Sequence, residues 1–185
     1  MKKFTLLVLL SCSTLLITAQ TGSGVFPLTS LTKIDLGPGG AGVSREMKLG
    51  NKLTFLAGAG MGGGYDVSED GIAITWSILS PAFYFYASPR FYYNREKRAS
   101  KEKDTKFNSG NYVGLGVKYV TSDMGDDPAQ RSAMLVNGHW GLQRYLGKKW
   151  VFDTHIGAGY AWDTNNRFGT IYPALELKFS YVLNK

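Results

Sequence analysis

The sequence is poor in cysteine, histidine and proline. Among its 185 residues one is cysteine, two are histidine and six are proline. The cysteine, Cys12, lies in a segment that we expect to be removed on export, which excludes disulfides and thiol chemistry from the mature chain. The mean hydropathy of -0.13 excludes a bundle of membrane helices. It does not exclude a membrane barrel, in which polar lumen residues offset apolar lipid-facing residues in any average.

The first residues predict a secretory signal peptide. Lys2 and Lys3 form a basic start, residues 4–17 form an apolar core, and Thr18-Ala19 is a small-residue end. This order predicts cleavage after Ala19, so that residues 1–19 are removed.

The position of Cys12 leaves an alternative open. Leu9-Leu10-Ser11-Cys12 matches a lipidation box, which would leave the chain attached to a membrane through a lipid. The apolar run continues beyond the cysteine from residue 13 to residue 19, which favours ordinary cleavage. Residues 20–30 are polar and small and predict a flexible lead-in, and residues 31–185 are enough for one domain.

Positive charge is in modest excess. Without Lys2 and Lys3 the chain has 19 basic and 14 acidic residues. Much of the excess lies between residues 95 and 106. In an exported protein such a run rarely indicates nucleic acid. It predicts a solvated turn or a contact with anionic lipid headgroups.

The sequence is rich in glycine, tyrosine and phenylalanine, and its organising element is the last predicted strand, residues 169–183. Alternate residues from Ile171 to Leu183 are apolar, whereas those between them include Glu176 and Lys178. A period of two over this length predicts a β-strand with two different surroundings. The strand exceeds the usual ~5–6 residues and reaches the ~9–11 tilted residues that cross a bilayer in a barrel.

The same alternation recurs along the chain and predicts an all-β fold of about eight strands. They span residues 31–49, 52–65, 72–79, 83–93, 113–119, 134–143, 150–162 and 169–183. The first is irregular, because its apolar residues change parity across residues 37–40, which predicts a bulge or kink. The segment 72–79 is either the third strand or part of a long loop. This pattern predicts an up-and-down antiparallel barrel.

Alternation alone fits a soluble barrel with an apolar interior as well as a transmembrane barrel with an apolar exterior. Two features favour the transmembrane barrel. Large aromatics gather near the ends of the apolar face, as in the aromatic girdles at bilayer surfaces. We assign four of them to the membrane interface: Trp150, Tyr160, Trp162 and Tyr181. The polar face is rich in glycine with isolated charges of both signs, which suits a small filled lumen.

The chain has a signal ending in Thr18-Ala19-Gln20, repeated aromatic hairpins, and a terminal strand containing Phe179 and Tyr181. Over its whole length it resembles small outer-membrane β-barrel proteins of Gram-negative bacteria. The resemblance implies a location in the outer membrane, contact with its lipids, and recognition of the last strand by the barrel-assembly machinery. That family usually ends on an aromatic residue, whereas this chain ends Leu183-Asn184-Lys185. We expect a monomer that binds no nucleic acid.

With both chain ends in the periplasm, alternation of the strands assigns a side to each connection. The connections at residues 66–71, 95–109 and 146–149 are then expected in the periplasm. Those at residues 50–51, 80–81, 122–131 and 163–168 are expected outside the cell. None of the outer connections is long, which weakens an interpretation as a large adhesin.

The polar face predicts a filled lumen, because a barrel of about eight strands has an interior that side chains just fill. The expected polar network consists of Arg90, Lys118, His139, Asp153, His155, Glu176 and Lys178. An unpaired charge is costly in so narrow a space. We therefore expect the cationic side chains to pair with Asp153, Glu176 or water.

His139 and His155 both fall on this polar face. They fit a metal pair or a catalytic base, but no further cysteine or histidine of the mature chain can complete a transition-metal site. We interpret them as hydrogen-bonded lumen residues. Gly58-x-Gly60-x-x-Gly63 matches a dinucleotide motif in form only, because a turn and a strand follow it instead of a helix. We expect no catalytic, cofactor or metal site.

Three functions remain open. The favoured one is a non-enzymatic integral outer-membrane barrel that contributes to envelope structure or surface interaction. The second is a narrow pore or carrier for small hydrophobic molecules. The third is a lipid-modifying envelope enzyme, because the resemblance includes enzymes with a His–Ser or His–Asp arrangement. Ser180 and Asp153 are available for it, although no spacing selects them.

Overall fold

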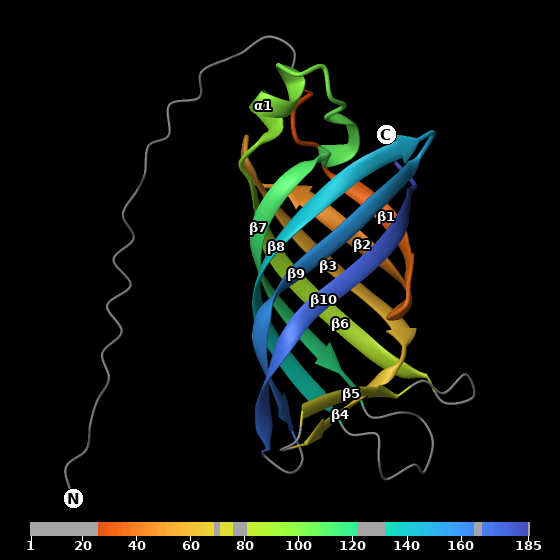
Figure 1. Ribbon diagram of the computed structural model, residues 1–185. Helices are drawn as coiled ribbons and strands as arrows, with labels where there is room; N and C mark the ends of the chain where they lie inside the picture. The colour runs from red at the N-terminus through yellow and green to blue at the C-terminus, as the bar shows by residue number, and fades with distance from the viewer. Residues whose placement is uncertain (1–25, 69–70, 76–80, 122–131, 165–167, 185) are drawn as a thin grey trace, which may run out of the picture.

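The protein is an all-β closed barrel of eight antiparallel strands (Figure 1). The computed structural model describes residues 26–68, 71–75, 81–121, 132–164 and 168–184. Around the barrel the strands follow the order β1-β10-β9-β8-β7-β6-β3-β2, so each strand pairs with its neighbours in the sequence of barrel strands. No helix in the described ranges is long and apolar enough to cross a membrane.

The elements are set by the alternation of apolar and polar residues. The barrel strands are β1 (Leu31–Gly37), β2 (Gly40–Lys48), β3 (Leu53–Gly62), β6 (Ala82–Tyr92), β7 (Gly110–Val120), β8 (Ala133–Gly147), β9 (Trp150–Asp163) and β10 (Gly169–Val182). Outside the barrel lie β4 (Gly64–Ser68) and β5 (Gly71–Thr75), the helix α1 (Arg95–Ala99), and a 3-10 turn (Lys106–Asn108).

The predicted number of strands is confirmed, but two of the predicted strands are wrong. The segment 31–49 is not one irregular strand, because it turns back at Gly37 and Gly40 to form the β1–β2 hairpin. Gly40 has a φ of 128°, and a Cβ added there would overlap the carbonyl oxygen of Met61, so a side chain would not fit. Pro38 and Gly39 make this a tight turn instead of a kink.

The segment 72–79 is not a barrel strand. Its described part belongs to β5, which pairs only with β4 in a separate two-stranded sheet; residues 76–80 lie outside the described residues. The predicted strand 52–65 therefore divides into β3 and β4. The barrel still closes with eight strands, because the predicted strand 72–79 is lost from it and the predicted strand 31–49 becomes β1 and β2.

These changes alter the predicted sides of two connections. The β2–β3 turn at Gly50 and Asn51 lies at the end of the barrel where β1 begins and β10 ends, which we call the terminal end. The β4–β5 hairpin lies at the opposite end, the far end (Figure 1). The sequence predicted residues 66–71 at the same end as the chain termini and residues 50–51 at the opposite end. The structure has the reverse arrangement. The connections 80–81 and 122–131 fall wholly or partly outside the described residues.

The two faces of the wall have the predicted parity. Exposed apolar side chains cover the outside of all eight strands. The inward side chains are largely polar or charged, and Arg90, Glu46 and Asp153 are each no more than 1% exposed. This distribution is the reverse of that in a water-soluble domain, where charged side chains are almost never fully buried unless paired.

The terminal end is covered by two segments that pack on each other. Residues 26–30, the last part of the predicted lead-in, contain Leu28, which is buried against Tyr92 and Tyr112. The β6–β7 connection holds this segment, because Arg95 donates a hydrogen bond to the carbonyl of Phe26 at 2.6 Å. The backbone of Thr29 also donates to Asn108. The basic connection thus folds over the barrel end (Figure 1).

The far end is covered by the β4–β5 hairpin. It contacts β8, β9 and β10, and Val67 is buried in an apolar cluster with Tyr84 and Leu135. Ile72 packs against the same cluster. The hairpin therefore lies across this mouth of the barrel.

The glycines of β3 make room for the tyrosines of β6, which leads to a first prediction. A Cβ added at Gly58 would lie 2.6 Å from Cζ of Tyr86, in an already packed wall. We expect Gly58→Val to lower the free energy of unfolding by ~1–3 kcal/mol through overpacking, measured by chemical denaturation. The control is Gly39→Ala, where an added Cβ meets nothing within 4 Å, and where we expect a change within ~0.5 kcal/mol. Equal effects of the two substitutions would contradict this account.

Candidate functional site

All seven residues of the predicted polar network lie on the lumen side of the wall. Arg90 is on β6, Lys118 on β7 and His139 on β8. Asp153 and His155 are on β9, and Glu176 and Lys178 on β10. The structure separates them into two groups: a compact ion-pair network near the terminal end and a wall of polar groups around a cavity.

The centre of the terminal network is the ion pair between Arg90 and Asp153. Nη1 of Arg90 lies 2.6 Å from Oδ2 of Asp153, and both side chains are 1% exposed. Tyr112 donates a hydrogen bond to the other carboxylate oxygen at 2.9 Å. The guanidinium also lies 4.3 Å from the ring centre of Tyr112. The carboxylate is thereby satisfied from two strands, as a buried charge requires.

A second buried ion pair joins the β1–β2 hairpin to the same network. Nζ of Lys33 lies 3.2 Å from Oε2 of Glu46, and the two side chains are 2% and 0% exposed. Tyr92 and Thr54 donate hydrogen bonds to the other oxygen of Glu46. Gln143 connects the pairs, since it bonds both Glu46 and Arg90.

Lys33 and Glu46 were not placed in the lumen from the sequence, and Gln143 was placed on the polar face but not in the polar network. The two charged residues were hidden because residues 31–49 were interpreted as one strand whose parity changes. Had the turn at Pro38 and Gly39 been recognised, the alternation in β1 would have placed Lys33 inside. Gln143 lies at the end of the predicted strand 134–143, whereas β8 continues to Gly147.

A layer of hydrogen bonds above this network closes β1 onto β10. The hydroxyl of Ser180 donates to Asp35 at 2.6 Å, and the hydroxyl of Tyr86 donates to the same carboxylate at 2.7 Å. Ser180 is therefore a partner of Asp35, and Asp153 is a partner of Arg90. Neither makes the histidine contact that a His–Ser or His–Asp arrangement requires.

A continuous series of polar contacts follows the wall formed by β8, β9 and β10. Nζ of Lys178 lies 3.0 Å from Glu176, and Nδ1 of His155 lies 3.4 Å from the same carboxylate. The His155 ring stacks on His139 with their centres 4.2 Å apart. His139 in turn contacts Asn137 at 2.6 Å.

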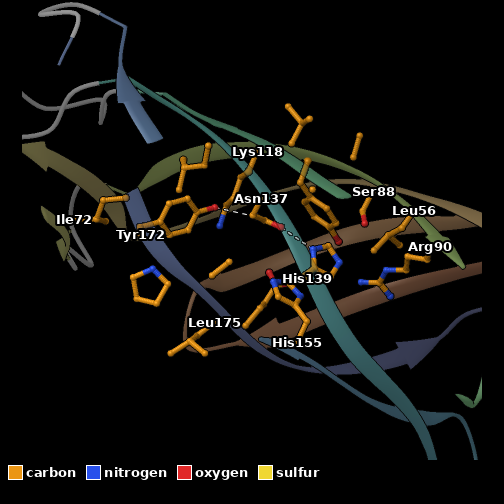
Figure 2. Close-up of a pocket in the computed structure, with 18 of the residues that line it drawn as sticks. Leu56, Ile72, Ser88, Arg90, Lys118, Asn137, His139, His155, Tyr172 and Leu175 are labelled. Carbon is orange, nitrogen blue, oxygen red and sulfur yellow. Dashed lines mark hydrogen bonds and ion pairs between the residues drawn. The ribbon is translucent and has the colours of Figure 1, made fainter. Parts of the chain in front are cut away.

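The two histidines are thus stacked on each other and held by neighbours of β8 and β10 (Figure 2). Asn137 continues the series by donating to the hydroxyl of Tyr172 at 2.9 Å. Within the described ranges no group of three or more His, Cys, Asp or Glu side chains is arranged to hold a metal ion. The pairing with Glu176 gives His155 a carboxylate partner that the sequence did not select.

This polar wall borders a cavity of about 470 Å³ in the far half of the lumen. Its apolar lining includes Leu56, Ile72 and Leu135, and its polar lining includes His139 and Glu176 (Figure 2). We call this cavity the chamber. The predicted filled lumen is therefore correct for the terminal half and wrong for the far half.

The lumen carries charges of both signs. In the described barrel strands the buried or cavity-lining cations are Lys33, Arg90, Lys118 and Lys178, and the carboxylates are Asp35, Glu46, Asp153, Asp163 and Glu176. Lys118 lies over the ring of Tyr84, with Nζ 4.6 Å from the ring centre. The interior therefore carries both signs at close range and has no large field of one sign.

The four predicted interface aromatics lie on the outer wall in two pairs. Trp150 and Tyr181 make an edge-to-face contact with ring centres 5.3 Å apart at the terminal end. Tyr160 and Trp162 lie 6.3 Å apart toward the far end. Each end of the β9–β10 surface thus carries one aromatic pair.

No family model, curated protein or solved structure matches the chain. The geometry of the barrel, its two faces and its chamber therefore carries the functional proposal. Of the observations above, the buried ion pairs make the clearest quantitative prediction about the site.

We predict that Asp153→Asn lowers the free energy of unfolding by ~3–5 kcal/mol, because it leaves the buried Arg90 without its charge partner. Chemical denaturation of the folded barrel measures this change. The matched control is Glu96→Gln, which breaks the exposed pair with Lys52, whose N···O distance is 3.0 Å; we expect a loss within ~1 kcal/mol there. The double change Arg90→Met with Asp153→Leu should recover part of the loss, because it removes both charges. A loss no larger than in Glu96→Gln would contradict the role of the pair.

Proposed function

We propose that this protein is a non-enzymatic integral outer-membrane β-barrel that serves envelope structure or surface interaction. The observation that carries the proposal is the distribution of side chains over the closed wall: apolar outside on every strand, ion-paired inside. A barrel in water would expose this surface to solvent, and contiguous exposed apolar patches of more than a few hundred Å² are rare in soluble monomers. In a bilayer the same surface meets hydrocarbon.

The outer surface supports this reading strand by strand. The most exposed apolar side chains are Ile171 at 78%, Leu175 at 68% and Leu115 at 63%. They lie on β10 and β7 among alternate residues that are all uncharged. Closure matters equally, because a bilayer offers no hydrogen bonds to an exposed sheet edge and only helices and closed barrels span it.

Two arginines are the charged exceptions on the outer side of the barrel strands. Arg45 pairs with Thr32, the second residue of β1, and Arg144 pairs with Phe152, the third residue of β9. Both therefore lie near the terminal end of the wall. Long cationic side chains near the end of a spanning segment reach the headgroups, which keeps their cost small.

The proposed orientation places the terminal end in the periplasm and the far end outside the cell. It rests on the expected signal peptide at residues 1–19 and on the even number of strands, which returns both chain ends to one side. Trp150 with Tyr181, and Tyr160 with Trp162, then lie at the two interfaces. In this proposal outer-membrane lipids surround the barrel, and assembly machinery reads β10 during its insertion.

The chamber favours a second candidate function, a carrier or receptor for small hydrophobic molecules. Its volume of about 470 Å³ falls in the ~300–1,000 Å³ range of small-molecule pockets. The terminal network below it closes the lumen with side chains that are almost wholly buried. A chamber closed at its terminal end favours a binding site with one entrance over a pore that passes through the barrel.

The test of the proposed function is the location of the full chain after expression in a Gram-negative host. We expect it in the outer-membrane fraction, soluble only with detergent, and migrating differently on gels before and after heating. Ile156, in the middle of β9 and 58% exposed, supplies the matched variant. We expect Ile156→Arg to cost ~2–4 kcal/mol of folding free energy at the bilayer midplane, against ~0–1 kcal/mol for Leu183→Arg near the interface.

Recovery of the parent chain as a detergent-free periplasmic protein would sink the membrane assignment. Equal stability of Ile156→Arg and Leu183→Arg in vesicles would do the same, because a depth-dependent cost requires a bilayer around β9.

We also predict that the barrel does not conduct ions like a general porin. The buried pairs Arg90–Asp153 and Lys33–Glu46 fill the terminal half of the lumen, and an interior of eight strands is just wide enough for such side chains. Purified protein in a planar bilayer should therefore show no steady porin-scale current. Such a current from the parent chain would favour the pore instead.

A further inference from the structure

The barrel wall is incomplete on one side of β10. Against β9, this strand pairs continuously from Gly169 to Tyr181. Against β1 it pairs only from Phe179 to Val182, opposite Leu36 to Lys33. The first ten residues of β10, Gly169 to Lys178, therefore have no β1 partner among the described residues. We call this unpaired edge the seam.

The seam exists because the β1–β2 hairpin is short. β1 has seven residues and turns at Gly37, whereas β10 has 14 residues. In Figure 1 β10 extends well past the β1–β2 turn toward the far end. Pro173 lies in the unpaired part of β10. Proline has no N–H to donate and is confined in sheets largely to edges of this kind.

A smaller cavity of about 150 Å³ lies at the seam. It is bordered on one side by the β1–β2 turn at residues 37–40 and on the other by β10 at residues 175–178. Tyr84 and Lys118, which point into the lumen, form its inner border. Lys118, Leu175 and Glu176 line both this cavity and the chamber. The outward residues Ile171 and Leu175 of β10 also line the chamber, so the chamber reaches the outside of the wall along the seam.

The two axial exits of the chamber are covered. Below it lies the Arg90–Asp153 network, and above it the apolar cluster that includes Val67 of the β4–β5 hairpin. An unpaired sheet edge facing hydrocarbon is costly, and such backbone is tolerated at membrane depth where it borders a cavity or is covered by protein. The seam meets this condition, because Glu176 and Lys178 on the same edge border cavities.

The chamber has separate apolar and polar regions. Leu135 and Ile72 belong to or pack on the cluster at its far end. Ser88 and His139 line it and are only 5% and 7% exposed. Oγ of Ser88 and Nε2 of His139 have no hydrogen-bond partner in the structure. Buried polar atoms of this kind are rare without a partner.

We propose that the chamber binds a single-chain amphiphile, such as a fatty acid, which enters sideways from the membrane through the seam. This inference rests on the proposed membrane location. Nδ1 of His139 faces the amide oxygen of Asn137, which leaves Nε2 as an acceptor for the O–H of a protonated carboxyl head. The hydroxyl of Ser88 donates to the carbonyl oxygen of the same head, and the hydrocarbon chain lies under Leu135 and Ile72. A lipid with two chains has too much volume for a chamber of about 470 Å³ in which polar groups occupy one side.

The test uses photo-crosslinking in outer-membrane vesicles that contain the full chain. The probe is a fatty acid with a photoreactive diazirine on its chain, compared with phosphatidylcholine carrying the same group. After irradiation, mass spectrometry maps the adducts. We expect the fatty acid to label both the chamber, at peptides carrying Leu135, and the outer wall, at peptides carrying Ile156. The two-chain lipid should label the outer wall alone.

A matched pair of variants separates binding in the chamber from contact with the wall. Ala174 is 2% exposed and lines the chamber, whereas Ala158, opposite Pro173 on the neighbouring strand, faces outward. Ala174→Phe should abolish chamber adducts by filling the space, and leave outer-wall adducts unchanged. Ala158→Phe should leave chamber adducts unchanged.

A pair of disulfides tests the route. Continuing the β1–β10 register places Pro38 opposite Leu177, and a Cβ added at the adjacent Gly37 would lie 3.5 Å from the backbone carbon of Leu177. Oxidised Pro38→Cys with Leu177→Cys ties the β1–β2 turn to β10 across the smaller cavity and should lower chamber labelling until the disulfide is broken. The control, Leu36→Cys with Phe179→Cys, joins positions that already pair and should label like the parent.

The outcomes distinguish this inference from the proposed function. Outer-wall adducts without chamber adducts would overturn the chamber site while leaving the membrane barrel standing. Absence of both kinds of adduct would overturn the membrane location itself. Chamber labelling that stays at the parent's level in the oxidised Pro38–Leu177 variant would overturn the seam as the route. Equal chamber labelling by phosphatidylcholine would overturn the single-chain assignment.

Discussion

The buried ion pair between Arg90 and Asp153 is the interaction on which the rest of the structure depends. It joins β6 to β9 across the lumen at 2.6 Å, and Gln143 links it to Lys33 and Glu46 on the hairpin. Placing charges in a low-dielectric interior costs several kcal/mol for each ion, which good geometry must offset. The wall around them must therefore be apolar outside and exact in register, so that these groups meet.

The requirement to pair the buried charges makes the two halves of the barrel different along its axis. In the terminal half, side chains from β1, β2, β3, β6, β7, β8 and β9 meet in the network, and residues 26–30 cover it. In the far half the interior opens into the chamber. The same barrel thus combines a rigid, closed base with a space that the chain itself does not fill, and ligand binding is expected only in the second part.

Much of the fold was predictable from the sequence, because a period of two directly reports the two faces of a strand. The inward position of Asp153, His155, Glu176 and Lys178 followed from it. The β1–β2 hairpin was not predicted. The apolar residues of the segment 31–49 change parity, and a kink and a turn both produce such a change. Lys33 and Glu46 were lost with it. The chamber also escaped prediction, because its volume depends on how side chains from opposite walls meet.

The misinterpreted hairpin is also the part of the barrel with functional consequences. Had residues 31–49 formed one long strand, β10 would have found a partner along its whole edge, and the lumen would have had only axial exits. A turn at Pro38 and Gly39 instead stops β1 after seven residues. Among the described residues, β10 then has no β1 partner on that edge at Glu176. The hydrogen bond between Ser180 and Asp35 holds β10 to β1 where the two strands still pair. The barrel therefore combines a base filled by ion pairs with an edge of β10 that has no β1 partner among the described residues, and the proposed sideways entry depends on that edge.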